Sequence, residues 1–264
     1  MKEPLPGKFA ESAEVCAPFE QILGIRFFNG SAAEAVENAV RIGGLIVAPS
    51  GTCFERLCND AIYRRALTEA DLALPDSGFM VLLCRLLRRK RINRVSGFAY
   101  LKQLLNGPAL SATGAAVWVL PNNRASEKAL RWLRTQGFGV STEDTYVAPF
   151  YRANVEDETL LGAVGTKRPR HIVIALAGGV QEKLGYFLRE QLPYRPTIHC
   201  IGGALGFLTG DQIAIPDWAD RFFLGWTFRL VAEPRRFLRR LWSARVLPAL
   251  ILKCGDNLPP AEIR

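Results

Sequence analysis

The sequence predicts an α/β fold with a mostly parallel sheet and flanking helices. Short apolar runs rich in β-branched residues alternate with stretches of helical periodicity along the chain. Two such runs, 171–176 and 197–201, each end in a glycine pair followed by the start of a helical pattern. Strand, glycine turn and helix in this succession are typical of parallel sheets with crossover connections. Ligands of such sheets bind beyond the carboxyl ends of the strands.

The elements are expected in order after an N-terminal arm, residues 1–18, that has no periodicity. We expect strands at 21–28, 45–48, 70–74, 115–120, 139–141, 171–176 and 197–201. We expect helices at 31–40, 52–67, from 78 into the basic cluster 85–91, at 97–105, 125–136, 158–164 and 181–191, and from 204. Ser31 and Glu34 have the spacing of a capping box. Residues 19–215 would thus form a Rossmann-like core.

Length and composition suit one large α/β domain or two small lobes. The 264 residues are 49% hydrophobic and 22% charged, which favours a globular chain over a disordered one. No run reaches the roughly 18 apolar residues of a membrane span, and the first residues lack the apolar stretch of a signal peptide. We therefore expect a cytoplasmic protein. The six cysteines form no Cys-x-x-Cys pair and the two histidines fall on expected buried strands, so we expect no metal site.

The two glycine pairs mark a candidate binding site. Glycines at strand ends let the backbone approach a ligand, and the helix that follows offers unpaired N–H groups to an anion. A polar triplet in the first turn of the first helix is expected to face the same crevice. The candidate residues are Gly178, Gly179, Gln181, Glu182, Lys183, Gly202 and Gly203. Alternatively the glycines only close tight turns, but two pairs at successive strand ends favour a site.

Asp76 is the carboxylate that position singles out. It follows an expected strand and precedes an expected helix, between Pro75 and Gly78. At the carboxyl edge of the sheet it could act as a general base, or it could cap the helix. Position alone favours the capping role.

The last fifth of the chain, residues 216–264, is expected to form a basic helical appendage. Residues 216–242 read as helix with aromatic side chains on one face and arginines on the other, and an apolar tail follows at 247–252. Eight basic and two acidic residues lie between Asp220 and Lys253. We prefer an amphipathic element on an anionic membrane surface. The alternative is a helix pair docked on the sheet with a solvated basic face.

Six motifs, in this order, are similar to those of the WecG/TagA/CpsF family of bacterial glycosyltransferases. They read LIVAPSG, ADLALPDSG, RVSG, IALAGGVQEK, IGGALGFLTG and FRLVAEPRRF. The resemblance covers about residues 20–242, and the form GGVQEKLG with the YRP and WADR segments resembles the exopolysaccharide branch. The family transfers a sugar from a UDP-sugar to a lipid-linked acceptor during synthesis of surface polysaccharides.

The resemblance implies roles for individual residues. The family's proposed base falls on Asp76, which reverses the preference for capping, and its Gln-Glu-Lys at the nucleotide-sugar crevice falls on residues 181–183. Its closing basic segment, which meets the lipid diphosphate and the membrane, falls on a basic face. The residues that match the family's segment are Arg229, Arg235 and Arg236, and Arg239 and Arg240 extend the same basic face. The implied transfer is inverting and needs no metal, which agrees with the absence of an Asp-x-Asp triplet from the sequence.

The chain departs from the family's pattern at several polar positions. Ser50 closes Ala48-Pro49-Ser50 where the family has Thr-Pro-Asn, so a donor or acceptor contact is altered. Ser77 replaces a glycine after the aspartate. The other departures are Phe98-Ala99, Leu205-Gly206-Phe207 and Leu224-Gly225-Trp226. We expect a different sugar rather than a lost activity, with glucose, mannose-type and uronic-acid donors all open.

The sequence thus predicts a glycosyltransferase associated peripherally with the inner face of the cell membrane. Its expected partners are a UDP-sugar, a polyprenyl-diphosphate-linked saccharide and an anionic membrane surface, with no cofactor and no nucleic acid. The sequence leaves room for a homo-oligomer. Two alternatives stay open: a family member that binds nucleotide sugar without catalysis, against which Asp76 and Gln181 argue, and a basic nucleic-acid-binding α/β domain.

Overall fold

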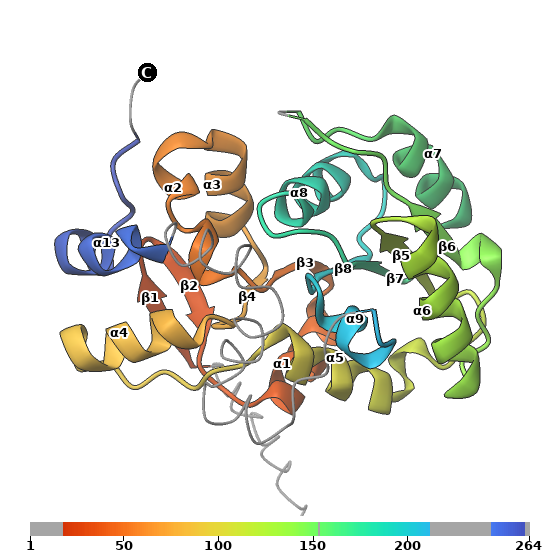
Figure 1. The fold of residues 1–264 in the computed structure, drawn as a ribbon, viewed down its shortest axis with the longest axis horizontal. Coiled ribbons are helices and arrows are strands. Elements are labelled where there is room, and N and C mark those ends of the chain that lie inside the picture. Colours follow the sequence, from red (N-terminus) through yellow and green to blue (C-terminus); the bar gives the residue numbers. More distant parts are fainter. Residues whose placement is uncertain (1–17, 153, 212–243, 262–264) are drawn as a thin grey trace, which may run out of the picture.

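The computed structural model describes residues 18–152, 154–211 and 244–261. These residues form an eight-stranded sheet with helices on both faces (Figure 1). The strands are β1 (Phe19–Ile22), β2 (Ile25–Phe28), β3 (Gly44–Val47), β4 (Leu72–Ala73), β5 (Ala116–Leu120), β6 (Thr145–Val147), β7 (His171–Ile174) and β8 (Thr197–Cys200). They lie in the order β1-β2-β4-β3-β8-β7-β5-β6. Only β1 and β2 pair antiparallel within this sheet, so the predicted mostly parallel arrangement is confirmed.

Two layers of helices cover the sheet. The α-helices are α1 (Ala32–Ile42), α2 (Arg56–Asn59), α3 (Ala61–Thr68), α4 (Gly78–Arg88), α5 (Gly97–Asn106), α6 (Asn123–Thr135), α7 (Glu158–Lys167), α8 (Gln181–Gln191), α9 (Ala204–Leu208) and α13 (Val246–Cys254). Helices α3, α4, α7, α8 and α13 share one hydrophobic core with the sheet, and α1, α5, α6 and α9 share another. Because both faces are covered, buried strands such as β5 and β7 read as continuous apolar runs.

Several local signals predict their elements correctly. The capping box at the start of α1 is present: the Ser31 hydroxyl accepts from the Glu34 N–H at 3.2 Å, and the Glu34 carboxylate accepts from the Ser31 N–H at 2.7 Å. Helix α8 has the predicted bounds, and α5 begins at the predicted residue. These signals are local, so they do not depend on how distant parts of the chain pack.

The first predicted strand, 21–28, is wrong as a single element, since it is the hairpin of β1 and β2. The chain reverses at Leu23 and Gly24, which both have positive φ, 51° and 77°. The backbone of the turn is held from outside, because the Leu23 and Gly24 N–H groups donate to the carbonyls of Gly255 and Asp256. The turn sits inside a continuous apolar run, and its partners lie more than 200 residues away, so the pattern alone hid it.

The predicted helix 52–67 is also wrong as one piece. A 3₁₀ turn at Gly51–Cys53 leads into the short α2, and α3 starts afresh after Asp60. Asp60 has extended backbone, φ −127°, and its carboxylate caps α3 by accepting from the Tyr63 N–H at 3.0 Å. An aspartate that caps a new helix ends the old one, because its backbone leaves the helical conformation.

Two smaller predictions need correction. The strand expected at 139–141 is absent; the chain instead enters a capping box in which the Ser141 N–H donates to Asp144 at 2.7 Å, and the strand follows as β6. The strand expected at 70–74 spans only the two residues of β4. Polar capping residues ended the extended run in the first case.

The C-terminal apolar tail is a helix, α13, that packs beside α4. Leu247 and Ile251 belong to the core on that face of the sheet and are fully buried. The predicted amphipathic segment 216–242 lies outside the described residues. The domain boundary expected at residue 216 therefore stays a prediction.

A chain of three buried polar side chains lies between α5 and the sheet. The Tyr100 hydroxyl meets His199 Nδ1 at 2.9 Å, and His199 Nε2 meets His171 Nδ1 at 3.1 Å. Both histidines are fully buried on strands, as expected. Burial lowers the pKa of His171 to about 4, helped by the charge of Arg170, and it lowers the pKa of His199 further below its usual range.

The hydrogen-bonded side chains of Tyr100, His199 and His171 predict that the fold is sensitive to acid. A folded-state pKa below the unfolded value of about 6.5 means that the unfolded chain binds more protons between those values, so stability is lost as pH falls from 6.5 towards 4. We expect the free energy of unfolding to fall by about 1 kcal/mol per pH unit for each histidine. Thermal unfolding at each pH measures the loss. The chain has only two histidines, so their imidazole NMR signals should stay those of neutral rings down to pH 5. Titration near pH 6.5 would contradict the assignment.

Candidate functional site

The sequence-predicted site residues lie on the segments that follow four neighbouring parallel strands. Ser50 follows β3, Asp76 follows β4, the pair at 178–179 follows β7, and the pair at 202–203 follows β8. The sheet order β4-β3-β8-β7 makes these four strand ends adjacent along one edge (Figure 1). The crossover from β4 to β5 carries the chain from one half of the sheet to the other. The half formed by β1 to β4 and the half formed by β5 to β8 meet between β3 and β8. This is the place in an open α/β sheet where ligands bind.

Asp76 is held at the N-terminus of α5. Its Oδ1 accepts a hydrogen bond from the Gly97 N–H at 2.9 Å, and its main-chain carbonyl accepts from Arg94 Nε at 2.9 Å. The carboxylate does not cap α4, because the Ser77 hydroxyl does so by accepting from the Met80 N–H at 3.2 Å. The positive end of the α5 dipole stabilises negative charge on Asp76. The half-buried carboxylate is therefore fixed in orientation, at a position where it could act as a proton acceptor.

The Arg94–Gly97 segment, the RVSG motif, brings Asp76 close to the centre of the sheet. Ser96 caps α5 by accepting from the Ala99 N–H at 3.1 Å. A Cβ atom added to Gly97 would lie 3.1 Å from the Ile201 carbonyl oxygen after β8 and 3.7 Å from Ala48 Cβ after β3. Glycine at this position lets the end of α5 approach both strand ends.

The Gly178–Gly179 turn contacts the segment after β3. A Cβ added to Gly178 would lie 3.1 Å from Cys53 Sγ and 3.8 Å from Ser50 Cβ. Gly179 has φ +87°, and a Cβ there would lie 2.8 Å from Arg56 Nε. The Arg56 guanidinium thus lies directly against this turn. The Arg56 side chain is 42% exposed. Its ion pair with Asp60 is long, with 3.9 Å between Arg56 Nη1 and Asp60 Oδ2.

Arg56 is a candidate site residue that the sequence did not single out. It belongs to no motif, and the expected continuous helix 52–67 gave no reason for it to point towards the glycine turn. A signal was present all the same, since an arginine in the first turns after a strand end is well placed to meet an anion at a sheet edge. Arg56 and Arg94 bring two guanidinium groups to the segments that surround this edge.

The triplet Gln181-Glu182-Lys183 is buried. Glu182 Oε2 accepts from the Gly179 N–H at 2.6 Å, and its Oε1 accepts from Gln181 Nε2 at 3.2 Å. Burial raises the pKa of Glu182, while these hydrogen bonds and the charge of Arg56 act in the opposite direction. The buried Glu182 carboxylate therefore fixes the backbone of the Gly178–Gly179 turn through the Gly179 N–H.

The other two members of the triplet tie neighbouring elements together. Gln181 Oε1 accepts from the Gly202 N–H at 2.6 Å, which joins the turn after β7 to the turn after β8. Gly202 has φ +60°, a conformation that favours glycine. Lys183 Nζ lies 2.9 Å from Asp60 Oδ2, which joins α8 to the start of α3. The part of the triplet in donor binding stays a prediction, as does that of Gly203.

The arginines expected at the acceptor diphosphate, from Arg229 to Arg240, lie outside the described residues. Across 18–152, 154–211 and 244–261, no three His, Cys, Asp or Glu side chains gather as metal ligands would. Every helix in the described part of the chain is too short or too polar to cross a bilayer.

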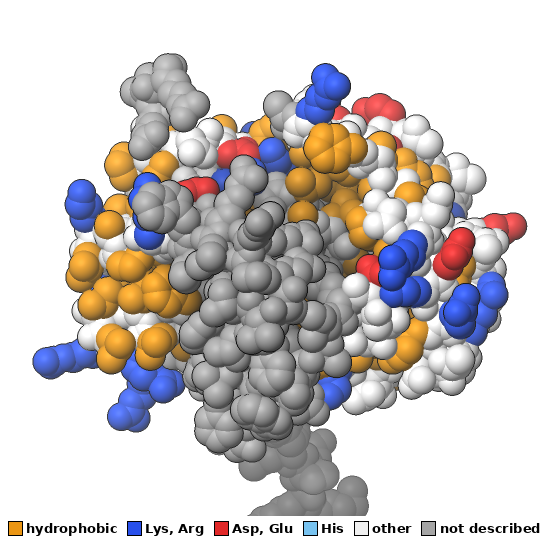
Figure 2. Space-filling view, in the orientation of Figure 1, with side chains coloured by type: hydrophobic (Ala, Val, Ile, Leu, Met, Phe, Trp, Pro, Cys, Tyr) orange, Lys and Arg blue, Asp and Glu red, His pale blue; other side chains and the backbone are white. Residues whose placement is uncertain are grey.

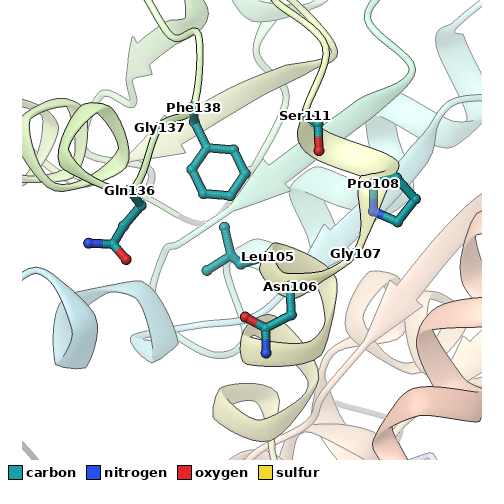
Figure 3. A pocket seen from close by; sticks show the side chains of 8 residues that line it. All are labelled: Leu105, Asn106, Gly107, Pro108, Ser111, Gln136, Gly137 and Phe138. Atoms are coloured by element: carbon teal, nitrogen blue, oxygen red, sulfur yellow. The ribbon is translucent and has the colours of Figure 1, made fainter.

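A shallow hollow of about 420 Å³ lies elsewhere, between the ends of α5 and α6 (Figure 3). Its lining residues are Leu105, Asn106, Gly107, Pro108, Ser111, Gln136, Gly137 and Phe138. None of them is charged, so the hollow has nothing to balance a diphosphate. It also lies at the far end of α5 from Gly97, roughly 15 Å away for ten helical residues. The strand-end edge remains the candidate active site.

A mostly parallel sheet between two helical layers, with fixed polar residues beyond adjacent strand ends, defines a Rossmann-like α/β enzyme. A family model described as "Glycosyl transferase WecG/TagA/CpsF family" matches residues 20–258. The chain belongs to this family, and it is a glycosyltransferase. The resemblance of its six motifs is thereby confirmed.

Two relatives share one name, N-acetylglucosaminyldiphosphoundecaprenol N-acetyl-beta-D-mannosaminyltransferase. The protein of Bacillus subtilis (strain 168) is 24% identical over 204 residues, 76% of this chain and 76% of the relative. The protein of Bacillus spizizenii (strain ATCC 23059 / NRRL B-14472 / W23) is 22% identical over 199 residues, 75% of this chain and 74% of the relative. Both names describe sugar transfer to a polyprenyl-diphosphate-linked acceptor.

Proposed function

We propose that the protein is an inverting, metal-independent glycosyltransferase. It moves a sugar from a UDP-sugar to a saccharide linked to polyprenyl diphosphate, in the synthesis of a bacterial surface polysaccharide or exopolysaccharide. Family membership and the names of the two relatives support the acceptor class. The observation that carries the proposal is the carboxylate of Asp76, fixed by the Gly97 N–H beside the ends of β3 and β8.

In the proposed reaction Asp76 removes the proton from an acceptor hydroxyl. The oxygen then attacks the anomeric carbon of the donor from the side opposite the leaving group, so a new glycosidic bond forms as the bond to the diphosphate breaks. UDP departs with the electron pair, and the configuration at the anomeric carbon inverts. A base at one face and a stabilised leaving group at the other are what such a displacement needs.

The leaving diphosphate would lie at the turns after β3, β7 and β8. Ser50, Gly178, Gly179, Gly202 and Gly203 line these turns, and residues 181–183 set their shape. Arg56, against Gly179, and Arg94, against the Asp76 loop, supply positive charge without a metal. Binding of a nucleotide diphosphate here rests on backbone shape and guanidinium groups.

The departures from the family's pattern support a changed donor sugar. Phe98 on α5 replaces a polar family position, and its ring contacts that of Phe207 on α9 edge to face, with centroids 5.8 Å apart. Gly206, next to Phe207, replaces the family's aspartate. Ser77, which replaces the family's glycine, caps α4. Ala48 lies beside the Gly97 backbone. These changes alter the lining near Asp76 and keep its support, which favours a new specificity over lost activity.

The acceptor and membrane side of the proposal rests on the basic face of residues 216–242. Eight basic residues against two acidic ones between Asp220 and Lys253 suit a lipid diphosphate and an anionic bilayer. The protein would then work at the inner face of the cell membrane without spanning it.

Asp76→Asn tests the base. The variant should keep its fold and its UDP-dependent rise in melting temperature, because asparagine retains an oxygen for the Gly97 N–H. Its turnover should fall by about 10²–10⁴-fold, the usual loss for a general base. Transfer from a UDP-sugar panel to a lipid-diphosphate acceptor measures the change. Glu37→Gln, which neutralises an exposed carboxylate on α1, serves as the matched control.

Activity of Asp76→Asn within a few fold of the wild type would contradict the assignment. A large loss of melting temperature would show a structural role. Thermal shifts with UDP, NAD and an oligonucleotide separate the alternatives, since a specific ligand stabilises the native state by mass action. UDP stabilisation without turnover would favour a binding protein, and equal stabilisation by oligonucleotide would favour the nucleic-acid interpretation.

Metal independence gives a separate prediction. Transfer should persist in excess EDTA, because guanidinium groups and backbone N–H groups balance the diphosphate in this proposal. The measurement is initial rate with and without chelator, followed by added Mg²⁺ or Mn²⁺. Complete loss that either ion restores would show a metal requirement.

The basic segment gives the next prediction. Changing Arg235, Arg236, Arg239 and Arg240 to glutamine should reduce sedimentation with anionic liposomes and lower turnover on long-chain acceptors, because each cation adds attraction to an anionic surface. UDP affinity should hardly change, which provides the internal control. Unaltered sedimentation would mean that these arginines form only a solvated face.

A further inference from the structure

Helix α4 presents an apolar face to solvent. Phe79, Leu82 and Leu86 are 42%, 48% and 67% exposed. Their spacing of three and four residues places them on one side of the helix, while Met80 and Cys84 on the other side are buried. Leu87 and, on the neighbouring α13, Leu252 are exposed as well. We call the exposed side chains of Phe79, Leu82, Leu86, Leu87 and Leu252 the α4 patch.

Arginine side chains border the α4 patch. Arg85, Arg88, Arg89 and Arg91 form no salt bridge with any other residue that the structure describes. Lys90 differs, since its Nζ lies 2.8 Å from Asp256. The side chain of Arg88 lies against Gly255, so the arginines reach the end of α13 too. Figure 2 shows hydrophobic side chains gathered over α4 and α13 at the left, with Lys and Arg side chains along the lower edge of this region.

We propose that the α4 patch docks the enzyme on an anionic lipid bilayer. Leucine and phenylalanine side chains would enter the headgroup boundary while the arginines meet lipid phosphates, the combination found in helices that lie on membranes. The inference deepens the proposed function, because a lipid-linked acceptor must be taken from such a surface. It assigns to residues 79–91 a membrane contact separate from that of the basic segment 216–242.

The position of α4 relative to Asp76 supports a lipid partner. The helix begins at Gly78, two residues after the proposed base. Eleven helical residues extend over roughly 16 Å, so every part of the patch on α4 lies within about that distance of the start of the helix. Docking through α4 therefore sets the candidate site near the headgroup layer, where the diphosphate of a polyprenyl chain is located.

Charge argues against a second copy of the chain as the partner. In a two-fold contact the same patch meets itself, so each of the two copies would bring the same four arginines to the interface. Like charges that face each other across an interface oppose association. Anionic headgroups complement both the apolar face and its border.

The test is flotation of the full-length chain with vesicles of phosphatidylcholine, with and without 30 mol% phosphatidylglycerol (about one lipid in three). One variant removes apolar contacts, Leu82→Gln with Leu86→Gln, and a second removes charge, Arg85→Gln with Arg89→Gln. Matched controls are Val147→Gln with Phe150→Gln, exposed apolar residues in and after β6 at the opposite edge of the sheet, and Arg124→Gln with Arg131→Gln on α6. Each is also made in the variant that lacks the four C-terminal arginines, so the two contacts are measured separately.

We expect the charge variant to lower partitioning into anionic vesicles roughly 30-fold, about fivefold for each cation. The apolar variant should lower it by about tenfold or more in both vesicle types. Added salt should weaken the binding of wild type and of the apolar variant more than that of the charge variant. Turnover on a short, water-soluble acceptor should be unchanged, and turnover on vesicle-borne acceptor should fall.

Wild-type partitioning by both patch variants would overturn the proposal. So would a change of oligomeric state in light scattering while vesicle binding stays constant, since the patch would then be a self-association surface. A wild-type chain that binds vesicles through the patch yet transfers no sugar would reject the proposed function and leave the membrane contact standing.

Discussion

The pairing of β3 with β8 is the constraint on which the site depends. Their parallel ladder runs from Gly44 opposite Thr197 to Val47 opposite Cys200, so two parts of the chain 153 residues apart end at the same level. The turns that follow then meet: the segment after β3 packs on the turn after β7, and the Gly97 backbone reaches between the ends of β3 and β8. Backbone hydrogen bonds in a sheet covered on both faces are shielded from water, which makes this register hard to slip.

Two kinds of polar residue occupy this edge of the sheet, and they differ in burial. Asp76 and Arg56 are partly exposed and can meet a substrate. Gln181 and Glu182 are buried, and they satisfy the N–H groups of Gly202 and Gly179. A buried carboxylate is costly without hydrogen-bond partners, so Glu182 stays in place only while the turn supplies them. The Gln181-Glu182-Lys183 motif thus stabilises the two glycine turns, whatever contact it makes with a ligand.

The sequence predicts the layout of this edge better than the contacts within it. Apolar runs, glycine pairs and caps are local features, and they predict β7, β8, α8 and the strand-end position of Asp76 correctly. What holds Asp76 is an N–H group 21 residues further on, and no local pattern encodes such a partner. The hairpin of β1 and β2 is hidden for the same reason, since its turn is held by carbonyls at Gly255 and Asp256.

The place of α13 bears on how shortened forms of this enzyme would behave. Its Leu247 and Ile251 fill the core beside α4, and the residues just after it fasten the first hairpin. Ending the chain ahead of the basic segment would therefore remove Leu247 and Ile251 from the hydrophobic core. The free energy of unfolding would fall by about 1.5–3 kcal/mol for each of these two side chains. Excising the basic segment alone and rejoining α9 to α13 through a flexible linker separates the two roles, because Leu247 and Ile251 then stay on the chain.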